Sequence, residues 1–216
     1  MEVLLKLKLR FKIFYHMYKL GITGGIASGK TTATNYLKSK YGAYIFNADK
    51  ESKKHLKSSI AIQKKIISIF GNDIVQDKKI NFELLANKVF SNPMNHKIIN
   101  GILWPEVYVL IDKSYDEIKR KRKHSLFIVD AALIFEAHYT HFFDSTLLIT
   151  TNKSERINRA VKRKNISLEN IQNRIALQMK DSEKKKIADT IINNNTSIKT
   201  FENRLDKFYE SLDLLK

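Results

Sequence analysis

The hydrophobic pattern of this chain alternates between strand-like and helix-like segments. Short apolar runs that are typical of buried strands occupy residues 19–23, 43–47, 126–129, 146–150 and 190–192. Apolar residues at helical spacing fill most of the stretches between them, among them 29–40 and the closing segment 197–215. Strands separated by helical segments predict a five-stranded parallel sheet with helices on both faces, which is a three-layer α/β fold.

Residues 50–124 show a different pattern, because helical spacing persists there and no strong strand interrupts it. Ile62, Ile66 and Ile69 recur at this spacing, and Pro105 is expected to open another helix. An all-helical insertion beside a parallel sheet predicts a lobe that binds the acceptor substrate.

We expect one domain over residues 17–216, preceded by a basic extension at 1–16. Basic and apolar residues alternate in this extension, so it lacks the uninterrupted apolar core of a secretory signal. It is expected to be dispensable, since Met17 stands just before the first strand; an organelle address is the alternative. The expected parts of the domain are a core of residues 17–50, 125–134 and 145–216, a helical acceptor lobe of about 51–124 and a lid of about 135–180.

Composition narrows the class of protein. Hydrophobic residues make up 43% of the 216 positions, as in an ordinary folded domain, and no cysteine is present to form a disulfide or a thiolate metal site. No apolar run is long enough to cross a bilayer. The net charge of +17 favours the binding of small polyanions. The basic residues are spread along the whole chain, which argues against a dedicated nucleic-acid-binding patch. We therefore expect a cytoplasmic protein, monomeric or a small homo-oligomer, with neither a nucleic-acid nor a membrane partner.

The stretch LGITGGIASGKTT at residues 20–32 holds four of the seven glycines. Its pattern G-x-x-x-x-G-K-[ST] follows a predicted strand and opens a predicted helix, which is the context of a phosphate-binding loop and predicts a P-loop NTPase fold. Lys30 is expected to reach the terminal phosphates of ATP, and the Thr31 hydroxyl to ligate Mg²⁺. The residues expected to bind nucleotide here are Gly24, Gly25, Ile26, Ala27, Ser28, Gly29, Lys30, Thr31 and Thr32.

Two aspartates follow predicted strands at the edge of the sheet where ligands collect. Asp49 can accept the proton of an attacking hydroxyl or help to hold Mg²⁺, and capping the next helix is an equal alternative. Asp130 can serve as a second carboxylate near Mg²⁺ or can orient the loop beyond it.

Three arginines follow the fourth predicted strand. Arg156, Arg159 and Arg163 are spaced by three and four residues, so they share one face of a helix. Guanidinium groups suit phosphate oxygens, and three of them on one face favour a bound polyanion. A solvated basic face is the alternative.

Several separate segments resemble those of the dephospho-coenzyme A kinase family. They occur in the order found in that family and extend from residue 20 to about residue 195. The segments are the phosphate loop, IFNADK at 45–50, FGNDIV at 70–75, VFSNP at 89–93, VDAALIFEA at 129–137, RIALQM at 174–179 and ADTIINNN at 188–195.

The resemblance implies transfer of the ATP γ-phosphoryl group to the ribose 3′-hydroxyl of dephospho-coenzyme A, the last step of coenzyme A synthesis. ATP and Mg²⁺ are the implied cofactors, and the helical lobe is implied to hold the acceptor. The implied catalytic residues are Asp49 as general base, Lys30, and the lid arginines Arg159 and Arg163. The resemblance also implies that Asn194 lies near the adenine of ATP and that Thr31 and Asp130 hold the metal. The residues implied to contact the acceptor are Asp49, Trp104, Glu136 and Gln178.

This chain departs from the family pattern at several positions. Asn47 replaces the first aspartate of an Asp-Ala-Asp segment, Phe82 replaces an arginine, and Ala132 replaces a proline. Trp104 stands where the family has histidine, and its ring could stack on adenine.

Three other functions are weighed against this one. A regulatory GTPase is excluded because the N-K-x-D-like segment 152–155 ends in glutamate and no Asp-x-x-Gly sequence exists. A nucleoside monophosphate kinase is the alternative enzyme. A nucleic-acid-stimulated ATPase or binding module, suggested by the charge of +17, is the alternative from another class.

Overall fold

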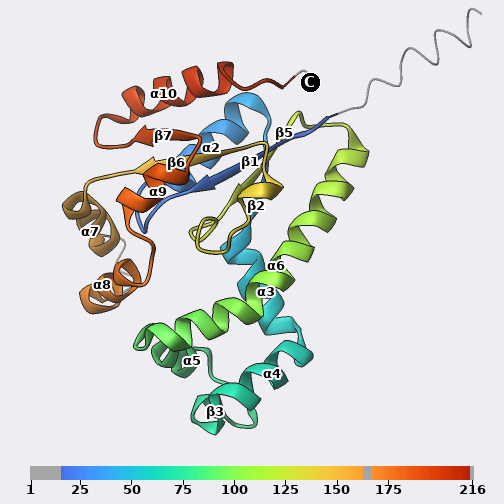
Figure 1. Cartoon of the computed structure of the whole chain (residues 1–216), viewed down its shortest axis with the longest axis vertical. Coiled ribbons are helices and arrows are strands. Elements are labelled where there is room, and N and C mark those ends of the chain that lie inside the picture. Colours follow the sequence, from blue (N-terminus) through green and yellow to red (C-terminus); the bar gives the residue numbers. More distant parts are fainter. Residues whose placement is uncertain (1–15, 163–166, 215–216) are drawn as a thin grey trace, which may run out of the picture.

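The computed structural model describes residues 16–162 and 167–214, which form a parallel five-stranded sheet with helices around it (Figure 1). The strand order is β2-β5-β1-β6-β7. All five strands were predicted within one or two residues of their ends: β1 (Tyr18–Thr23), β2 (Tyr44–Asn47), β5 (Leu126–Asp130), β6 (Ser145–Thr150) and β7 (Thr190–Asn193). The three central strands read as continuous apolar runs because both faces of the sheet are covered.

Each face of the sheet has its own apolar layer. On one face, α2 (Lys30–Tyr41) and α10 (Ile198–Glu210) contribute Leu37, Phe201 and Leu205 to a cluster with alternate residues of the strands. On the other face, the second half of α6 (Pro93–Lys121) contributes Ile111 and Tyr115. The three-layer prediction is confirmed, although α10 ends at 210 and the predicted helix extended to 215.

A separate apolar cluster holds the lobe together. It is built from α3 (Ala48–Ser58), α4 (Ile60–Phe70), the short η1 (Asn72–Ile74), α5 (Phe82–Phe90) and the first half of α6. The lobe also contains a two-stranded hairpin that the sequence did not predict, β3 (Val75–Gln76) and β4 (Lys79–Ile80). Its turn places Asp77 and Lys78 at φ values of 50° and 61°. Glycine is the usual sequence signal for such a turn, and this turn contains none.

Helix α6 corrects the prediction that Pro105 opens a helix. The helix begins at Pro93, and Pro105 lies inside it without ending it. Proline lacks an N–H for the carbonyl of Gly101, so one hydrogen bond is missing in the interior of α6. Figure 1 shows that α6 is bent along its course. Packing on both sides of the bend keeps the two halves helical, since Ile102 belongs to the lobe cluster and Val107 to the sheet cluster.

Helices α7 (Lys153–Lys162), α8 (Leu168–Ala176) and α9 (Asp181–Ile187) follow strand β6. The range 135–180 expected for the lid overlaps the core, since it contains the sheet strand β6 as well as α7 and α8. Arg163 lies outside the described residues, as do residues 1–15 of the extension expected at 1–16. Among the helices of the described part of the chain, none combines the length and the apolar character that a membrane span needs.

Candidate active site

The phosphate loop connects β1 to α2 and depends on glycine at both of its ends. Gly24 and Gly29 have φ values of 151° and 107°, which other residues rarely adopt. A Cβ atom at Gly24 would also collide with the carbonyl oxygen of Ile149 on the neighbouring strand. The loop is thus fixed against the central strands at the carboxyl edge of the sheet, and the N-terminus of α2 points its free N–H groups at the same place.

Side chains from later segments brace this loop from outside. Arg156 is almost fully buried; its Nε donates to the Ile26 carbonyl at 3.0 Å, and its Nη1 lies 3.1 Å from Asp181 Oδ2. The Asn194 Nδ2 donates to the Ser28 carbonyl at 2.9 Å. The expectation that three arginines share a face for a polyanion therefore fails for Arg156, because its guanidinium is already occupied by the loop and by Asp181.

Arg159 lies on the same helix but has a more open position. Its Nε donates to Glu155 Oε1 at 2.9 Å and its Nη2 to the Asn194 carbonyl at 3.1 Å. It is half-buried at the side of the phosphate loop, so its guanidinium can approach a bound nucleotide without a change of fold.

Lys30 occupies the centre of the site. Its Nζ donates to the Gly24 carbonyl at 2.8 Å, and burial lowers its pKa while Asp130 and Asp49 oppose this shift. A lysine whose ammonium is held by loop carbonyls and flanked by two aspartates is positioned for the terminal phosphates of a nucleotide.

Asp130 ends β5 and is buried beside Asn47. The Asn47 Nδ2 donates to Asp130 Oδ2 at 3.3 Å. Burial raises the pKa of Asp130 to about 6; Lys30 lowers it, and the negative charge of Asp49 raises it. An asparagine at position 47 supplies a donor here, whereas an aspartate would add a third negative charge.

The raised pKa of Asp130 predicts that Asp130→Asn increases the stability of the metal-free protein, by an amount that depends on pH. The folded state binds the Asp130 proton more tightly than the unfolded state, so this group's stabilising contribution is present below pH 4 and is lost as pH rises through about 6. The variant should therefore exceed the wild type in unfolding free energy by about 2–3 kcal/mol at pH 7 and by much less at pH 4.5. Urea denaturation in EDTA at both pH values measures this, and a difference independent of pH would contradict it.

Asp49 lies at the first turn of α3 and faces the open space in front of Lys30. The structure answers the question of helix capping, because the N-cap of α3 is Asn47, whose side chain accepts a hydrogen bond from the Lys50 N–H at 2.8 Å. The surrounding walls remove water from Asp49 and raise its pKa, while Lys30, Lys53 and the Ala132 backbone oppose the shift. Solvent still reaches the carboxylate, so a substrate hydroxyl can reach it too.

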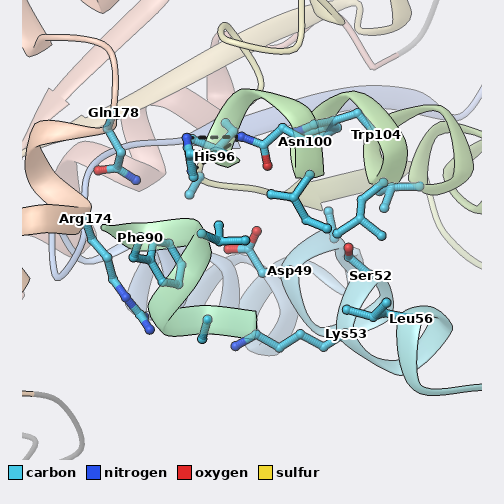
Figure 2. Close-up of a pocket in the computed structure, with 18 of the residues that line it drawn as sticks. Asp49, Ser52, Lys53, Leu56, Phe90, His96, Asn100, Trp104, Arg174 and Gln178 are labelled. Carbon is cyan, nitrogen blue, oxygen red and sulfur yellow. Dashed lines mark hydrogen bonds between the residues drawn. The ribbon is translucent and has the colours of Figure 1, made fainter. Parts of the chain in front are cut away.

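A cavity of about 600 Å³ extends from the phosphate loop into the helical lobe. Asp49 lies at its centre, with Trp104 on one wall and Gln178 on another (Figure 2). Trp104 is held edge-on to Tyr139, with ring centroids 5.5 Å apart. The structure thus brings together six sequence-predicted residues at one cavity: Ile26, Ala27, Lys30, Asp49, Trp104 and Gln178.

Glu136 lies behind the cavity wall and does not line it. Its Oε1 is 2.8 Å from the fully buried Lys184 Nζ and accepts a hydrogen bond from the Met179 N–H at 2.9 Å. This pair ties the segment after β5 to the segment after α8. Glu136 is therefore placed as a structural anchor beside the cavity.

Glu136→Gln should destabilise the fold, because it leaves the buried Lys184 ammonium without its counter-charge. We expect the unfolding free energy to fall by about 3 kcal/mol, measured by urea denaturation. Glu117→Gln is the matched control, since Glu117 forms an exposed pair with Lys121. An equal response of the two variants would contradict the anchoring role.

Two functional candidates were missed in the sequence. Arg174 and Lys53 both line the cavity, but they come from helices that are far apart in the chain. Two signals were present: Lys53 follows Asp49 by four residues and thus shares its helical face, and Arg174 begins the family-like segment RIALQM at 174–179.

The whole chain can now be compared with known proteins. A family model described as dephospho-CoA kinase matches residues 18–200. A dephospho-CoA kinase from Chlamydia caviae is 34% identical over 196 residues, covering 91% of this chain and 96% of that protein. A solved dephospho-CoA kinase from Campylobacter jejuni is 28% identical, with a TM-score of 0.62 over 89% of this chain and 95% of that one.

A second solved structure, TT1252 from Thermus thermophilus, is similar over its whole length. It is 26% identical and has a TM-score of 0.74, covering 91% of this chain and 98% of that one. The match of the family model over most of the chain agrees with the phosphate loop, the helical lobe and the cavity between them. The chain belongs to the dephospho-CoA kinase family.

Proposed function

We propose that this protein transfers the γ-phosphoryl group of ATP to the ribose 3′-hydroxyl of dephospho-CoA, giving CoA and ADP. One observation carries the proposal: a single cavity joins the phosphate loop to the helical lobe, and Asp49 lies at the junction beside Lys30. A donor phosphate in the loop and an acceptor hydroxyl in the lobe would meet at this carboxylate.

The reaction is an in-line displacement at the γ-phosphorus. The acceptor 3′-oxygen forms a bond to this phosphorus as the bond to the β,γ-bridging oxygen breaks, and ADP leaves. The Asp49 carboxylate takes the proton of the hydroxyl, which its position in the cavity favours. Lys30 and the N-terminus of α2 stabilise charge on the transferred group, and most of the rate enhancement comes from positioning and from these fixed charges.

The remaining predicted residues have supporting roles in this proposal. Arg159, together with Arg163 from outside the described residues, neutralises the triphosphate. Asn194 holds the Ser28 carbonyl and so shapes the loop on the adenine side. Trp104 offers an aromatic surface to the acceptor, and Gln178 offers a buried Oε1 that has no hydrogen-bond donor among the described residues.

The residues at the loop also fit a magnesium ion. Thr31, the second residue of α2, is exposed, and Asp130 lies close enough to Lys30 to affect its pKa. Hydroxyl and carboxylate oxygens are the hard ligands that Mg²⁺ takes beside nucleotide phosphates. The ion would supply further neutralisation of the β- and γ-phosphate oxygens. We further propose a cytoplasmic enzyme that is a monomer or a small homo-oligomer.

Transfer of label from [γ-³²P]ATP tests the function. Dephospho-CoA, adenosine, AMP and a single-stranded oligonucleotide are offered separately, and products are resolved by chromatography. We expect labelled CoA as the dominant product. Preferred labelling of AMP would instead support a nucleoside monophosphate kinase, and ATP hydrolysis raised by the oligonucleotide would support a nucleic-acid-stimulated ATPase.

A further inference from the structure

Arg174 presents a guanidinium to the cavity and forms no ion pair with a carboxylate of residues 16–162 or 167–214. The group lies 4.5 Å from the centre of the Phe90 ring, and its Nε is buried with no hydrogen-bond partner among the described residues. Burial alone lowers its pKa, and no neighbouring anion opposes the shift. A buried donor of this kind is costly unless a ligand supplies the acceptor.

Two lysines approach the same part of the cavity from α3. Lys53 and Lys57 line the cavity, and neither forms an ion pair with any residue of the described chain. Figure 2 shows the charged ends of Arg174 and Lys53 pointing toward each other from opposite sides, beneath Phe90. Asp49 is the only acidic residue among those that line the cavity. The outer part of the cavity therefore has an excess of positive charge.

The spacing along α3 relates these cations to the reacting group. Asp49, Lys53 and Lys57 follow one another at intervals of four residues, so they lie on one face of the helix. Each interval advances about 6 Å along the axis. A ribose whose 3′-hydroxyl lies at Asp49 would thus place its 5′-phosphate near Lys53.

We propose that Arg174, with Lys53 and Lys57, binds the diphosphate of the acceptor while its 3′-hydroxyl lies at Asp49. This inference rests on the proposed function and adds the recognition element for the acceptor. The guanidinium supplies a planar pair of donors to the phosphate oxygens, and the Phe90 ring, 4.5 Å away, supports it by a cation–π contact. These three cations therefore select an adenosine that carries a 5′-diphosphate over one that does not.

Steady-state kinetics of four variants test the proposal. Arg174→Gln should raise the KM for dephospho-CoA by about 10- to 100-fold, as expected for a lost charge-assisted hydrogen bond, and should change the KM for ATP by less than about twofold. Arg174→Lys keeps the charge without the planar fork and should fall between the wild type and Arg174→Gln. Lys53→Gln should raise the same KM independently of any packing on Phe90. Arg120→Gln, at the exposed end of α6, is the matched control and should change neither constant.

A binding measurement separates the diphosphate from the rest of the acceptor. Trp104 is the single tryptophan and lines the cavity, so its fluorescence reports binding of dephospho-CoA and of adenosine. In Arg174→Gln the Kd for dephospho-CoA should rise about 10- to 100-fold and that for adenosine should not.

Three results would overturn the inference while leaving the proposed function intact. These are an unchanged KM for dephospho-CoA in both Arg174→Gln and Lys53→Gln, a rise in the KM for ATP instead, and equal weakening of adenosine and dephospho-CoA. A wild-type protein that does not phosphorylate dephospho-CoA at all would overturn the proposed function, and this inference with it.

Discussion

Lys30→Met should reduce turnover by about 10³-fold or more, because in the proposed mechanism Lys30 is the cation of the loop that neutralises the terminal phosphates. In the free protein the Lys30 ammonium is held at 2.8 Å from the Gly24 carbonyl and lies between Asp49 and Asp130. Methionine keeps the length of the side chain and removes only the charge and the donors.

The measurement is kcat with saturating ATP and dephospho-CoA, together with thermal unfolding. Removing a partly desolvated ammonium should leave the fold intact. Lys38→Met is the matched control, since Lys38 is exposed near the other end of α2. Turnover of the Lys30 variant within tenfold of the wild type would show that the loop does not hold the transferred phosphate.

Asp49→Asn should lower kcat by about 10²- to 10⁴-fold while the KM for ATP stays nearly unchanged. Asparagine preserves the shape of the carboxylate but does not accept the proton of the attacking hydroxyl. The stability of α3 should not change, because Asn47 provides its N-cap. Glu51→Gln, on the same helix, is the control and should leave kcat unchanged.

The pH–rate profile adds a readout that a structural role would not alter. Burial raises the pKa of Asp49, and only the ionised form acts as a base, so turnover should fall as pH decreases through this raised pKa. The acidic limb attributable to Asp49 should disappear in the asparagine variant. An unchanged kcat and an unchanged profile would assign the proton to another acceptor.

The features that the sequence predicted correctly are those encoded by consecutive residues. Strand β1 is a largely apolar run, the loop after it has glycine at two of its three positions with positive φ, and Lys30 opens the next helix. Asp49 could be placed beside the loop because the carboxyl ends of parallel strands share one edge of a sheet. In each case local spacing and one general rule of sheet topology were sufficient.

The features that were missed depend on contacts between distant segments. Pro105 reads as a helix start, but packing of α6 on both the lobe and the sheet extends the helix through it. Arg156 and Arg159 look equivalent on a helical face, yet only Arg156 is bonded to the loop at Ile26. Arg174 and Lys53 line the same cavity only because α8 lies across it from α3, which the local pattern of neither helix encodes.

A crystal structure with a non-hydrolysable ATP analogue, Mg²⁺ and dephospho-CoA tests the central claim most directly. We predict that the triphosphate occupies the loop at Lys30 and that the acceptor 3′-oxygen lies about 3 Å from the Asp49 carboxylate. An empty loop, or an acceptor whose 3′-oxygen lies beyond the reach of Asp49, would contradict the account.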